Sequence, residues 1–335
     1  METIMKKVLV IGGTGTMGQY LCPILAEMGY QVDAIAGEIK KDTPCIKYYF
    51  ANALDNTVLQ SFLSKHYDAV VDFMWYDAEL FKSRYTMFLQ NTDHYFALSS
   101  YRVYAQSDKP LTESSPRLSE ALDADDVWMH STGYAQTKCL MEDLLQKSDY
   151  NNWTALRPTV VYCPGRMPLV TYSKNEVALR AYSGREFVLP REAMTKTTTL
   201  VWGQDVARMI AGLIFNEQAK REIYNTATAE TMTWGEVLDC YSEMFGLKAH
   251  FCDTDEYFKM ICENSTDQNY INKKRFLFYY DRMYNRSVDN SKVLKAAGMT
   301  QNELMPMRKG LELSVGKNIP VFCKTMDSFL KGEIK

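Results

Sequence analysis

The first strong hydrophobic pattern in the chain is the apolar run Val8–Ile11, which a glycine-rich turn follows at once. A short apolar run of this kind is typical of a strand buried on both faces of a parallel sheet. After the turn, Leu21, Leu25 and Met28 recur at helical spacing and indicate an amphipathic helix. The chain is therefore predicted to begin with a strand, a tight turn and a helix.

The alternation of strand-like and helix-like segments continues to about residue 162. Further strands are predicted at 30–36, 46–50, 68–74, 95–98 and 153–162, the last broken by Arg157-Pro158. Helices are predicted after Asp55, at 78–90 and at 133–147. Strands that alternate with helices form a parallel sheet, because each connection crosses a face of the sheet. We therefore predict an α/β fold, a Rossmann doubly wound parallel sheet with a smaller, mixed C-terminal domain.

The glycine-rich turn carries the first indication of function. Gly12, Gly15 and Gly18 follow the spacing G-x-x-G-x-x-G, a variant of the dinucleotide-binding fingerprint. Unpaired backbone N–H groups at a helix N-terminus, at the positive end of the helix dipole, can hold a pyrophosphate. No Gly-Lys-Ser/Thr sequence closes the turn, which excludes a Walker A loop. We predict an NAD(P) site here.

The end of the second predicted strand leaves the choice between NAD and NADP open. An acidic residue at this place would bind the ribose hydroxyls of NAD. The chain has Gly37 and Glu38 there, followed by Lys40 and Lys41. Glu38 suits a ribose hydroxyl, the lysines suit a 2'-phosphate, and an exposed charged loop fits equally well. We expect NAD or NADP, with NAD slightly favoured.

The regular alternation fades beyond Gly165. We predict an NAD(P)-binding Rossmann domain over residues 1–165 and a substrate-binding region over 166–335, with about 200–226 returning to the first domain. Within the second part, residues 174–183 have a helical pattern. Asp205 is expected to cap another helix, and Thr233 begins a capping box that opens a third.

Composition and charge limit the remaining possibilities. The 335 residues carry a net charge of −3, which provides no general attraction for nucleic acid or anionic membranes. The 8 cysteines include no C-x-x-C pair and the 4 histidines are isolated, so no metal site is indicated. No apolar stretch is long enough to span a bilayer. We expect a soluble, cytoplasmic protein that binds no metal, nucleic acid or membrane.

A tyrosine and a lysine supply the candidate chemistry. Tyr134 and Lys138 are four residues apart in one predicted helix, so their side chains share a face. A nearby ammonium favours the phenolate and lowers the pKa of a tyrosine toward the range useful for a base. Ser100, at the end of a predicted strand, can donate a hydrogen bond to the same reacting oxygen. The Y-x-x-x-K pattern recurs at Tyr270 and Lys274, without such a serine before it, and we assign that copy to surface structure.

With these residues in place, the chain resembles the extended short-chain dehydrogenase/reductases, also called the NAD-dependent epimerase/dehydratase family. The segments that carry the resemblance are Gly12–Gly18, Ser99–Tyr104, Tyr134–Lys138, Leu156–Tyr162, Leu200–Ala207, Ile223–Asn225 and Val288–Lys292. Within the family it is most similar to an atypical branch that includes chloroplast stem-loop RNA-binding proteins and bacterial proteins described as sugar epimerases.

The resemblance implies a role for each residue of the site. Tyr134 is the expected base and Lys138 its partner. Ser100 rather than Ser99 is the expected hydroxyl donor, because it stands four residues before the matched Tyr104. The expected cofactor-binding residues are Gly12, Thr14, Gly15, Thr16, Met17, Gly18, Gly37, Asn52, Ala53, Phe73, Met74, Ser99, Lys138, Pro158 and Val160. The expected substrate-binding residues are Ser100, Tyr101, Arg166 and Arg286.

The chain departs from the family pattern at two functional places. Nucleotide-sugar enzymes carry an arginine for the diphosphate where this chain has Lys196–Thr199, so Arg282 or Arg286 is left to meet a phosphate or to be a surface charge. No acidic residue precedes Tyr134, since Thr132 and Gly133 stand there, and this disfavours dehydratase chemistry.

Three functions follow as hypotheses. The first is a nucleotide-sugar epimerase that inverts C4 through a 4-keto intermediate, with Tyr134 as base and NAD(P) as hydride carrier. The second is a net NAD(P)H-dependent reductase of a ketone or sugar. The third is a non-catalytic RNA-binding or regulatory protein with the same fold. A homodimer is possible through the apolar stripes of residues 78–92 or 133–147.

Overall fold

The computed structural model describes residues 5–129, 133–172, 176–177, 180, 186–262 and 265–315. At its centre is a seven-stranded sheet of order β11-β6-β5-β4-β1-β2-β3, in which every neighbouring pair is parallel. The strands are β1 (Lys7–Ile11), β2 (Gln31–Ala36), β3 (Ile46–Phe50), β4 (Ala69–Asp72), β5 (Tyr95–Leu98), β6 (Trp153–Leu156) and β11 (Glu222–Tyr224). The predicted doubly wound α/β fold is confirmed.

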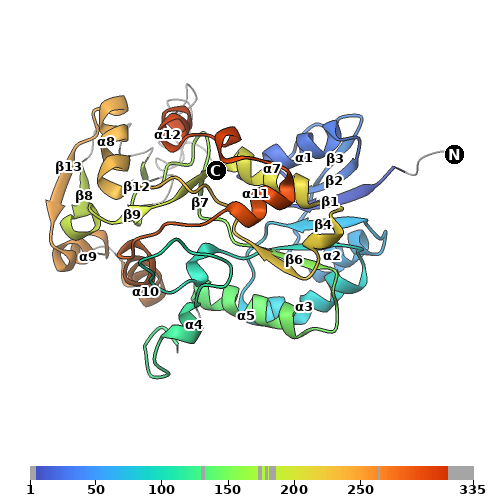
Figure 1. Ribbon diagram of the computed structural model, residues 1–335, viewed down its shortest axis with the longest axis horizontal. Helices are drawn as coiled ribbons and strands as arrows, with labels where there is room; N and C mark the ends of the chain where they lie inside the picture. The colour runs from blue at the N-terminus through green and yellow to red at the C-terminus, as the bar shows by residue number, and fades with distance from the viewer. Residues whose placement is uncertain are drawn as a thin grey trace.

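Strand β1 supplies side chains to a hydrophobic core on each face of the sheet. Val8 and Val10 belong to one core, and Leu9 and Ile11 belong to the other. Burial on both sides explains why this strand is apolar at four consecutive positions. The first face is covered by α1 (Gly18–Glu27), α7 (Gly203–Leu213) and α11 (Ser291–Ala297), and the second by α2 (Asn56–Leu63), α3 (Ala78–Gln90) and α5 (Tyr134–Lys147) (Figure 1).

Two predicted helix caps have different outcomes. The side chain of Asp55 accepts a hydrogen bond from the backbone N–H of Thr57 at 2.7 Å and caps α2, as predicted. The predicted cap at Asp205 is wrong, because α7 already begins at Gly203. Asp205 lies buried in the first turn, and its carboxylate accepts the backbone N–H of Met305 at 2.6 Å. The carboxylate thus ties a distant segment to the helix.

The strand predicted at residues 153–162, with its break at Arg157-Pro158, forms two strands in different sheets. β6 stays in the main sheet, whereas β7 (Val160–Tyr162) pairs with β10 (Leu200–Trp202) in a separate small sheet. Pro158 lies at the division, and proline has no N–H with which to continue a ladder. The division turns the chain away from the main sheet toward a third hydrophobic core.

Short elements build the smaller region around this third core (Figure 1). β8 (Phe187–Pro190) pairs with β13 (Ala249–Cys252), and β9 (Thr197–Thr198) pairs with β12 (Met232–Thr233). The helices there are α8 (Trp234–Phe245), α9 (Thr254–Cys262), α10 (Gln268–Leu277) and α12 (Met307–Val315). The predicted capping box at Thr233 is confirmed at the start of α8. Most of the helix predicted at 174–183 lies outside the described residues.

The remaining elements are short and lie in connections. They are α4 (Leu118–Ala121), the 3-10 turns η1 (Tyr101–Val103), η2 (Arg191–Ala193), η3 (Glu217–Ala219) and η5 (Gln301–Glu303), and the π-helical turn η4 (Phe278–Arg282). Among the described residues, no helix combines the length and apolar character needed to cross a membrane.

Replacing Gly18 by alanine is predicted to destabilise the protein. A Cβ at Gly18 would collide with the carbonyl oxygen of Gly12 and lie 2.7 Å from the Cα of Gly13. Relieving this overlap requires a backbone shift, so we expect the free energy of unfolding to fall by about 1–3 kcal/mol. Gly37→Ala is the control, because a Cβ there meets nothing within 4 Å. Urea denaturation of both variants tests this, and equal stabilities would contradict it.

Candidate active site

A cavity of about 610 Å³ opens at the carboxyl ends of the sheet strands. Its walls come from the turn after β1, the segments that follow β4, β5 and β6, and the ends of α5 and α10. A second cavity of about 430 Å³ lies beside it and shares Gly12 and Met74 with it. The second cavity is lined by the ends of β2 and β3. Together they form an extended cleft along the carboxyl ends of the strands, which is where sheets of this kind bind dinucleotides.

The glycine turn has the geometry that a diphosphate requires. Gly12 has φ +86°, a left-handed conformation that a side chain would disfavour. The N–H groups of Gly12 and Gly13 both donate to the carbonyl of Ile35 at 2.9 Å, which fixes the turn against β2. At the start of α1, Met17 provides no side-chain cap, and the first turn of the helix contains no acidic residue. An anion is thus the natural partner of the N-terminus of α1, where no side chain caps the helix.

Most of the predicted cofactor residues line the cleft. The larger cavity contains Gly12, Gly15, Thr16, Met17, Gly18, Phe73, Met74, Pro158 and Val160. The smaller one contains Gly37, Asn52 and Ala53. Three predicted residues, Thr14, Ser99 and Lys138, line neither cavity. Glu38, Lys40 and Lys41 are also outside the lining of the smaller cavity, so no charged side chain there selects NAD or NADP among the described residues.

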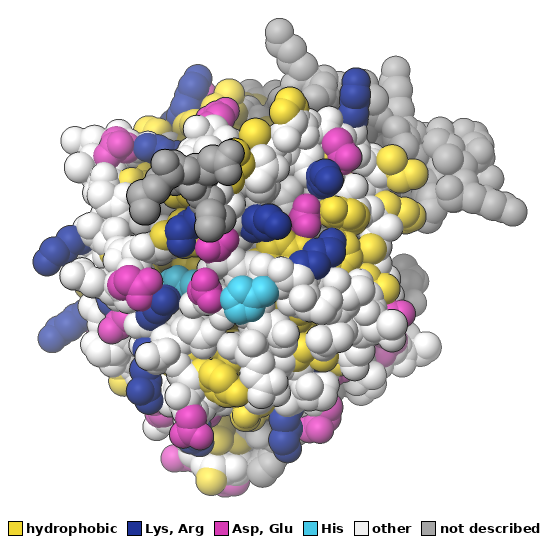
Figure 2. Space-filling model, turned by 90° about the vertical axis from the view of Figure 1, so that its right-hand side faces the viewer, with side chains coloured by type: hydrophobic (Ala, Val, Ile, Leu, Met, Phe, Trp, Pro, Cys, Tyr) yellow, Lys and Arg dark blue, Asp and Glu magenta, His cyan; other side chains and the backbone are white. Residues whose placement is uncertain are grey.

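A further cavity lies at the opposite, amino ends of the strands. It measures about 470 Å³ and is lined by charges of both signs, including Lys6, Lys220, Asp68 and Glu217. Figure 2 shows this side of the molecule, where basic and acidic side chains are interspersed. In contrast, the large cavity at the carboxyl ends is lined by Arg102, Arg166 and Arg282 and, within the described residues, by no acidic side chain. Of these two cavities, the one at the carboxyl ends therefore favours a negatively charged ligand.

Tyr134 and Ser100 lie in the wall of the same large cavity. Tyr134 is the first residue of α5, and Ser100 immediately precedes η1. Burial raises the pKa of the Tyr134 phenol, while Arg102, a hydrogen bond with Ser100 and the charge of Arg166 act to lower it. A serine hydroxyl and a phenol in the wall of one cavity are suited to hold one substrate oxygen between them. Thr132, which the sequence places just before the tyrosine, lies outside the described residues.

Lys138 lies beneath the tyrosine rather than in the cavity wall. Its Nζ is 5.6 Å from the centroid of the Tyr134 ring and donates to the carbonyl oxygen of Leu98 at 2.5 Å. Burial lowers the pKa of Lys138 to about 8, against the opposing effect of Asp72 and Glu142. The second tyrosine–lysine pair has nearly the same internal geometry, with Lys274 Nζ 5.5 Å from the Tyr270 ring centroid. Neither residue of that pair lines the large cavity, and Lys274 donates instead to the carbonyl of Thr171.

The predicted substrate-binding residues separate into two groups. Ser100, Tyr101 and Arg166 line the large cavity, and Arg166 donates to the hydroxyl of Thr16 at 3.1 Å, beside the glycine turn. Arg286 is not brought into the cavity. Its guanidinium is buried and donates to Asp281 and to the carbonyls of Tyr104, Ala105 and Tyr280. It therefore stabilises the fold behind the cavity.

Arg282 takes the place in the cavity wall that was expected of Arg286. It donates to the carbonyl of Val170 at 2.8 Å and to the hydroxyl of Tyr101 at 2.9 Å, and it pairs with Asp281. The sequence left Arg282 and Arg286 as alternatives because both belong to one short segment. Only the π-helical turn at 278–282 decides which side chain faces the cavity.

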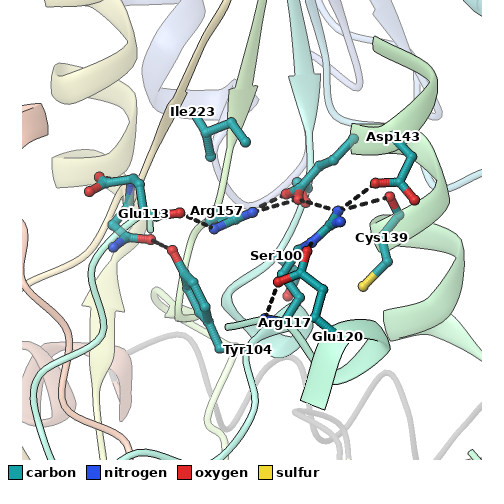
Figure 3. A network of polar contacts seen from close by, with 12 residues as sticks. Ser100, Tyr104, Glu113, Arg117, Glu120, Cys139, Asp143, Arg157 and Ile223 are labelled. Carbon is teal, nitrogen blue, oxygen red and sulfur yellow. Dashed lines mark hydrogen bonds and ion pairs between the residues drawn. The ribbon is translucent and has the colours of Figure 1, made fainter. Parts of the chain in front are cut away.

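A buried ion pair joins the elements that carry the proposed catalytic side chains. Both carboxylate oxygens of Glu142, on α5, accept from Arg157 at 2.7 and 2.6 Å. One of these oxygens also accepts the hydroxyl of Ser99 at 2.5 Å, so the buried Ser99 side chain points to α5. Arg117 extends the network to Glu120 and Asp143 (Figure 3).

Several lining residues were not among the expected site residues, although Arg282 was named as an alternative phosphate ligand. Trp75, Leu98, Arg102, Thr159, Val161, Leu277 and Arg282 complete the wall of the large cavity. Arg102 was within reach of the sequence, because it lies between the matched residues Ser100 and Tyr104. Leu277 and Arg282 come from the C-terminal region, whose path over the cleft depends on tertiary packing.

The sequence profile of the family described as "NAD dependent epimerase/dehydratase family" matches residues 8–227. The chain belongs to this family. Solved structures with the same fold include MoeE5 in complex with UDP-glucuronic acid and NAD and a Thermus thermophilus UDP-glucose 4-epimerase in complex with NAD. The glycine turn and the cleft described above fit an NAD(P) cofactor.

One curated relative is the chloroplast stem-loop binding protein of 41 kDa b from Arabidopsis thaliana. It is 28% identical over 247 residues, which make up 68% of this chain and 60% of the relative. The match thus spans less than two thirds of the length of that protein.

Solved structures share the fold over nearly the whole chain. An epimerase from Methanothermobacter thermautotrophicus superposes with a TM-score of 0.71 at 16% identity, covering 98% of this chain and 95% of that one. A UDP-glucuronic acid 4-epimerase from Bacillus cereus, in complex with UDP-glucuronic acid and NAD, gives 0.68 at 15% identity, covering 94% and 99%. At these identities the likeness concerns the fold.

Removing the charge of Glu142 is predicted to destabilise the protein strongly. Glu142→Gln would leave the guanidinium of Arg157, which is 2% exposed, without its buried counter-charge. Breaking a buried pair on one side costs about 3–5 kcal/mol of unfolding free energy. Glu120→Gln is the control, since the Glu120 side chain is 50% exposed and we expect a loss below about 1 kcal/mol. Similar losses in both variants, measured by denaturant unfolding, would contradict this.

The burial of Lys138 predicts a pH-dependent contribution to stability. Below pH 8 both the folded and the unfolded chain carry the ammonium, and the folded state bears its desolvation. Between pH 8 and 10.5 only the unfolded chain keeps the proton, so stability rises with pH. Relative to Lys138→Met, the wild type should gain on the order of 3 kcal/mol across that range. The exposed Lys147, replaced in the same way, should show a flat difference, and a flat difference at Lys138 would refute the prediction.

Proposed function

We propose that the chain is an NAD(P)-dependent nucleotide-sugar epimerase that inverts C4 of its substrate through a 4-keto intermediate, with Tyr134 as base. The observation that supports this most is the shared cavity. It contains the glycine turn, Ser100 and Tyr134, although the turn and Tyr134 are more than a hundred residues apart in the sequence.

The chain's own residues would prepare the substrate for reaction. Tyr134 would accept the proton of the C4 hydroxyl, and Ser100 would donate a hydrogen bond to the same oxygen. Lys138, held against the carbonyl of Leu98, would keep a positive charge under the tyrosine ring at neutral pH. When bound, NAD(P) supplies the hydride acceptor and donor. The turn Gly12–Gly18 and Phe73, Met74, Pro158 and Val160 would hold it.

Arginines in the cavity wall support a substrate that carries a diphosphate. Arg282, from the C-terminal region, is the arginine that we assign to the substrate. Arg166 lies beside the glycine turn, where the cofactor diphosphate would be bound. Guanidinium groups bind phosphate oxygens through charge-assisted hydrogen bonds. Several structural neighbours are described in complex with UDP-sugars, among them a UDP-glucose 4-epimerase from Thermotoga maritima at 16% identity. We therefore favour a UDP-sugar as the first substrate to test.

A second candidate is RNA binding without catalysis. The curated relative described as a chloroplast stem-loop binding protein is the observation that favours it. The net charge of −3 provides no general attraction for RNA. A gel-shift titration with a structured RNA at physiological salt tests this candidate. Binding that weakens steeply with added salt would support it, and absence of a shift would reject it.

Tyr134→Phe is predicted to abolish epimerisation while the cofactor stays bound. The purified protein is expected to contain NAD(P) and to convert UDP-galactose to UDP-glucose without added cofactor. Loss of a general base lowers the rate by about 10²–10⁴-fold, so kcat should fall by at least about a hundredfold. Tyr270→Phe is the matched control, because Tyr270 has the same lysine geometry away from the cavity.

Three results would contradict the proposal. They are a Tyr134→Phe variant that keeps more than about a tenth of the wild-type rate, failure with every UDP-, dTDP-, GDP- and CDP-sugar tried, and a stoichiometric change in nicotinamide absorbance during turnover. The last result would instead identify a net reductase.

A further inference from the structure

Arg102 is the one cavity-wall arginine without a polar side-chain partner among the described residues. Its guanidinium carbon lies 5.1 Å from the centroid of the Tyr134 ring. Its Nε is buried and has no hydrogen-bond partner, and its guanidinium forms no ion pair in the described part of the chain. A buried donor with a positive charge and no partner is unfavourable, and native structures retain such groups mainly where a ligand completes them.

The other two arginines of the cavity are already engaged. Arg166 donates to Thr16, and Arg282 is shared among Tyr101, Val170 and Asp281. Asp281, the nearest acidic group of this cluster, also pairs with Arg286 and accepts the hydroxyl of Tyr101 at 2.7 Å. Its carboxylate is therefore shared among Tyr101, Arg282 and Arg286. Its charge acts on Arg102 through space, but it forms no hydrogen bond or ion pair with Arg102 that is found among the described residues.

The position of Arg102 restricts what kind of anion it would meet. It stands two residues after Ser100 and over the ring of Tyr134, the two side chains proposed to hold the reacting oxygen. Arg166, by contrast, lies beside the glycine turn, where a cofactor diphosphate would be bound. An anion at Arg102 must therefore belong to the part of the substrate that reacts.

We propose that Arg102 is a specificity-determining residue. The substrate in this proposal is a nucleotide sugar with a carboxylate on the carbon next to its reacting carbon, as in a hexuronate. This inference rests on the proposed function. In a hexuronate the carboxylate is carried by C5, the neighbour of C4. If Tyr134 and Ser100 hold the C4 oxygen, the carboxylate falls beside them, where a planar guanidinium matches its two oxygens.

The test compares UDP-glucuronate with UDP-glucose, which differ only in having a carboxylate or a hydroxymethyl group at C5. Their affinities are measured by calorimetry with the NAD-loaded protein. A Tyr134→Phe background prevents turnover and keeps the ring over which Arg102 lies. We expect UDP-glucuronate to bind about ten- to a hundredfold more tightly, as one charge-assisted hydrogen-bonded contact provides.

Replacing Arg102 separates the inference from its alternatives. In Arg102→Met the preference for UDP-glucuronate should fall to within about threefold, while UDP-glucose affinity stays unchanged, and Arg102→Lys should restore part of it. The unfolding temperature of ligand-free Arg102→Met should be equal to or above that of the wild type, because a buried donor without a hydrogen-bond partner has been removed.

Other outcomes would overturn the inference. Equal weakening of both sugars in Arg102→Met would mean that Arg102 binds the shared diphosphate. Equal affinities for UDP-glucuronate and UDP-glucose in the protein that keeps Arg102 would mean that the site does not recognise the carboxylate. A large fall in unfolding temperature would make Arg102 a structural residue. If NAD binds and neither sugar does, the proposed function itself fails, and that result differs from all of the others.

Discussion

The carboxylate of Glu142 is the interaction on which the candidate active site depends. It accepts two bonds from Arg157 at the end of β6 and one from Ser99 at the end of β5. Glu142 itself lies on α5, two turns after Tyr134. One buried carboxylate therefore fixes the helix that carries the tyrosine against the strand end that carries Ser100. Because the pair is buried, these elements cannot slide past each other without exposing or separating charges.

The parallel sheet gives this interaction its reach. All strands of the central sheet run in one direction, so the turns after β1, β4, β5 and β6 open at the same edge. Residues that are far apart in the sequence meet there without any long-range motif. The glycine turn is tied to Ile35 through two N–H groups and lines both cavities of the cleft. The C-terminal π-helical turn adds Arg282 to the wall of the larger cavity.

The sequence was sufficient for the frame of the site and insufficient for its electrostatics. The turn Gly12–Gly18 and the strand end at Ser100 were predictable, because local spacing and burial decide them. The predicted cap at Asp205 was wrong, because α7 begins two residues earlier and the Asp205 carboxylate accepts a tertiary hydrogen bond from Met305. Likewise Arg282 and Arg286 are indistinguishable by composition, and only the backbone path places one in the cavity and the other behind it.

Lys138 and Arg102 illustrate why two positive charges beside one tyrosine are not interchangeable. Lys138 is sealed below the ring, and burial lowers its pKa to about 8, so its charge is conditional on pH. Its shortest bond is to the carbonyl of Leu98, which makes it a support for the end of β5 as much as an electrostatic neighbour. Arg102 faces the cavity, and a guanidinium keeps its charge throughout the physiological range. Of the charged groups that lower the pKa of Tyr134, Arg102 has the largest effect. The lysine therefore positions the proposed base, while the arginine sets the charge that an incoming substrate meets.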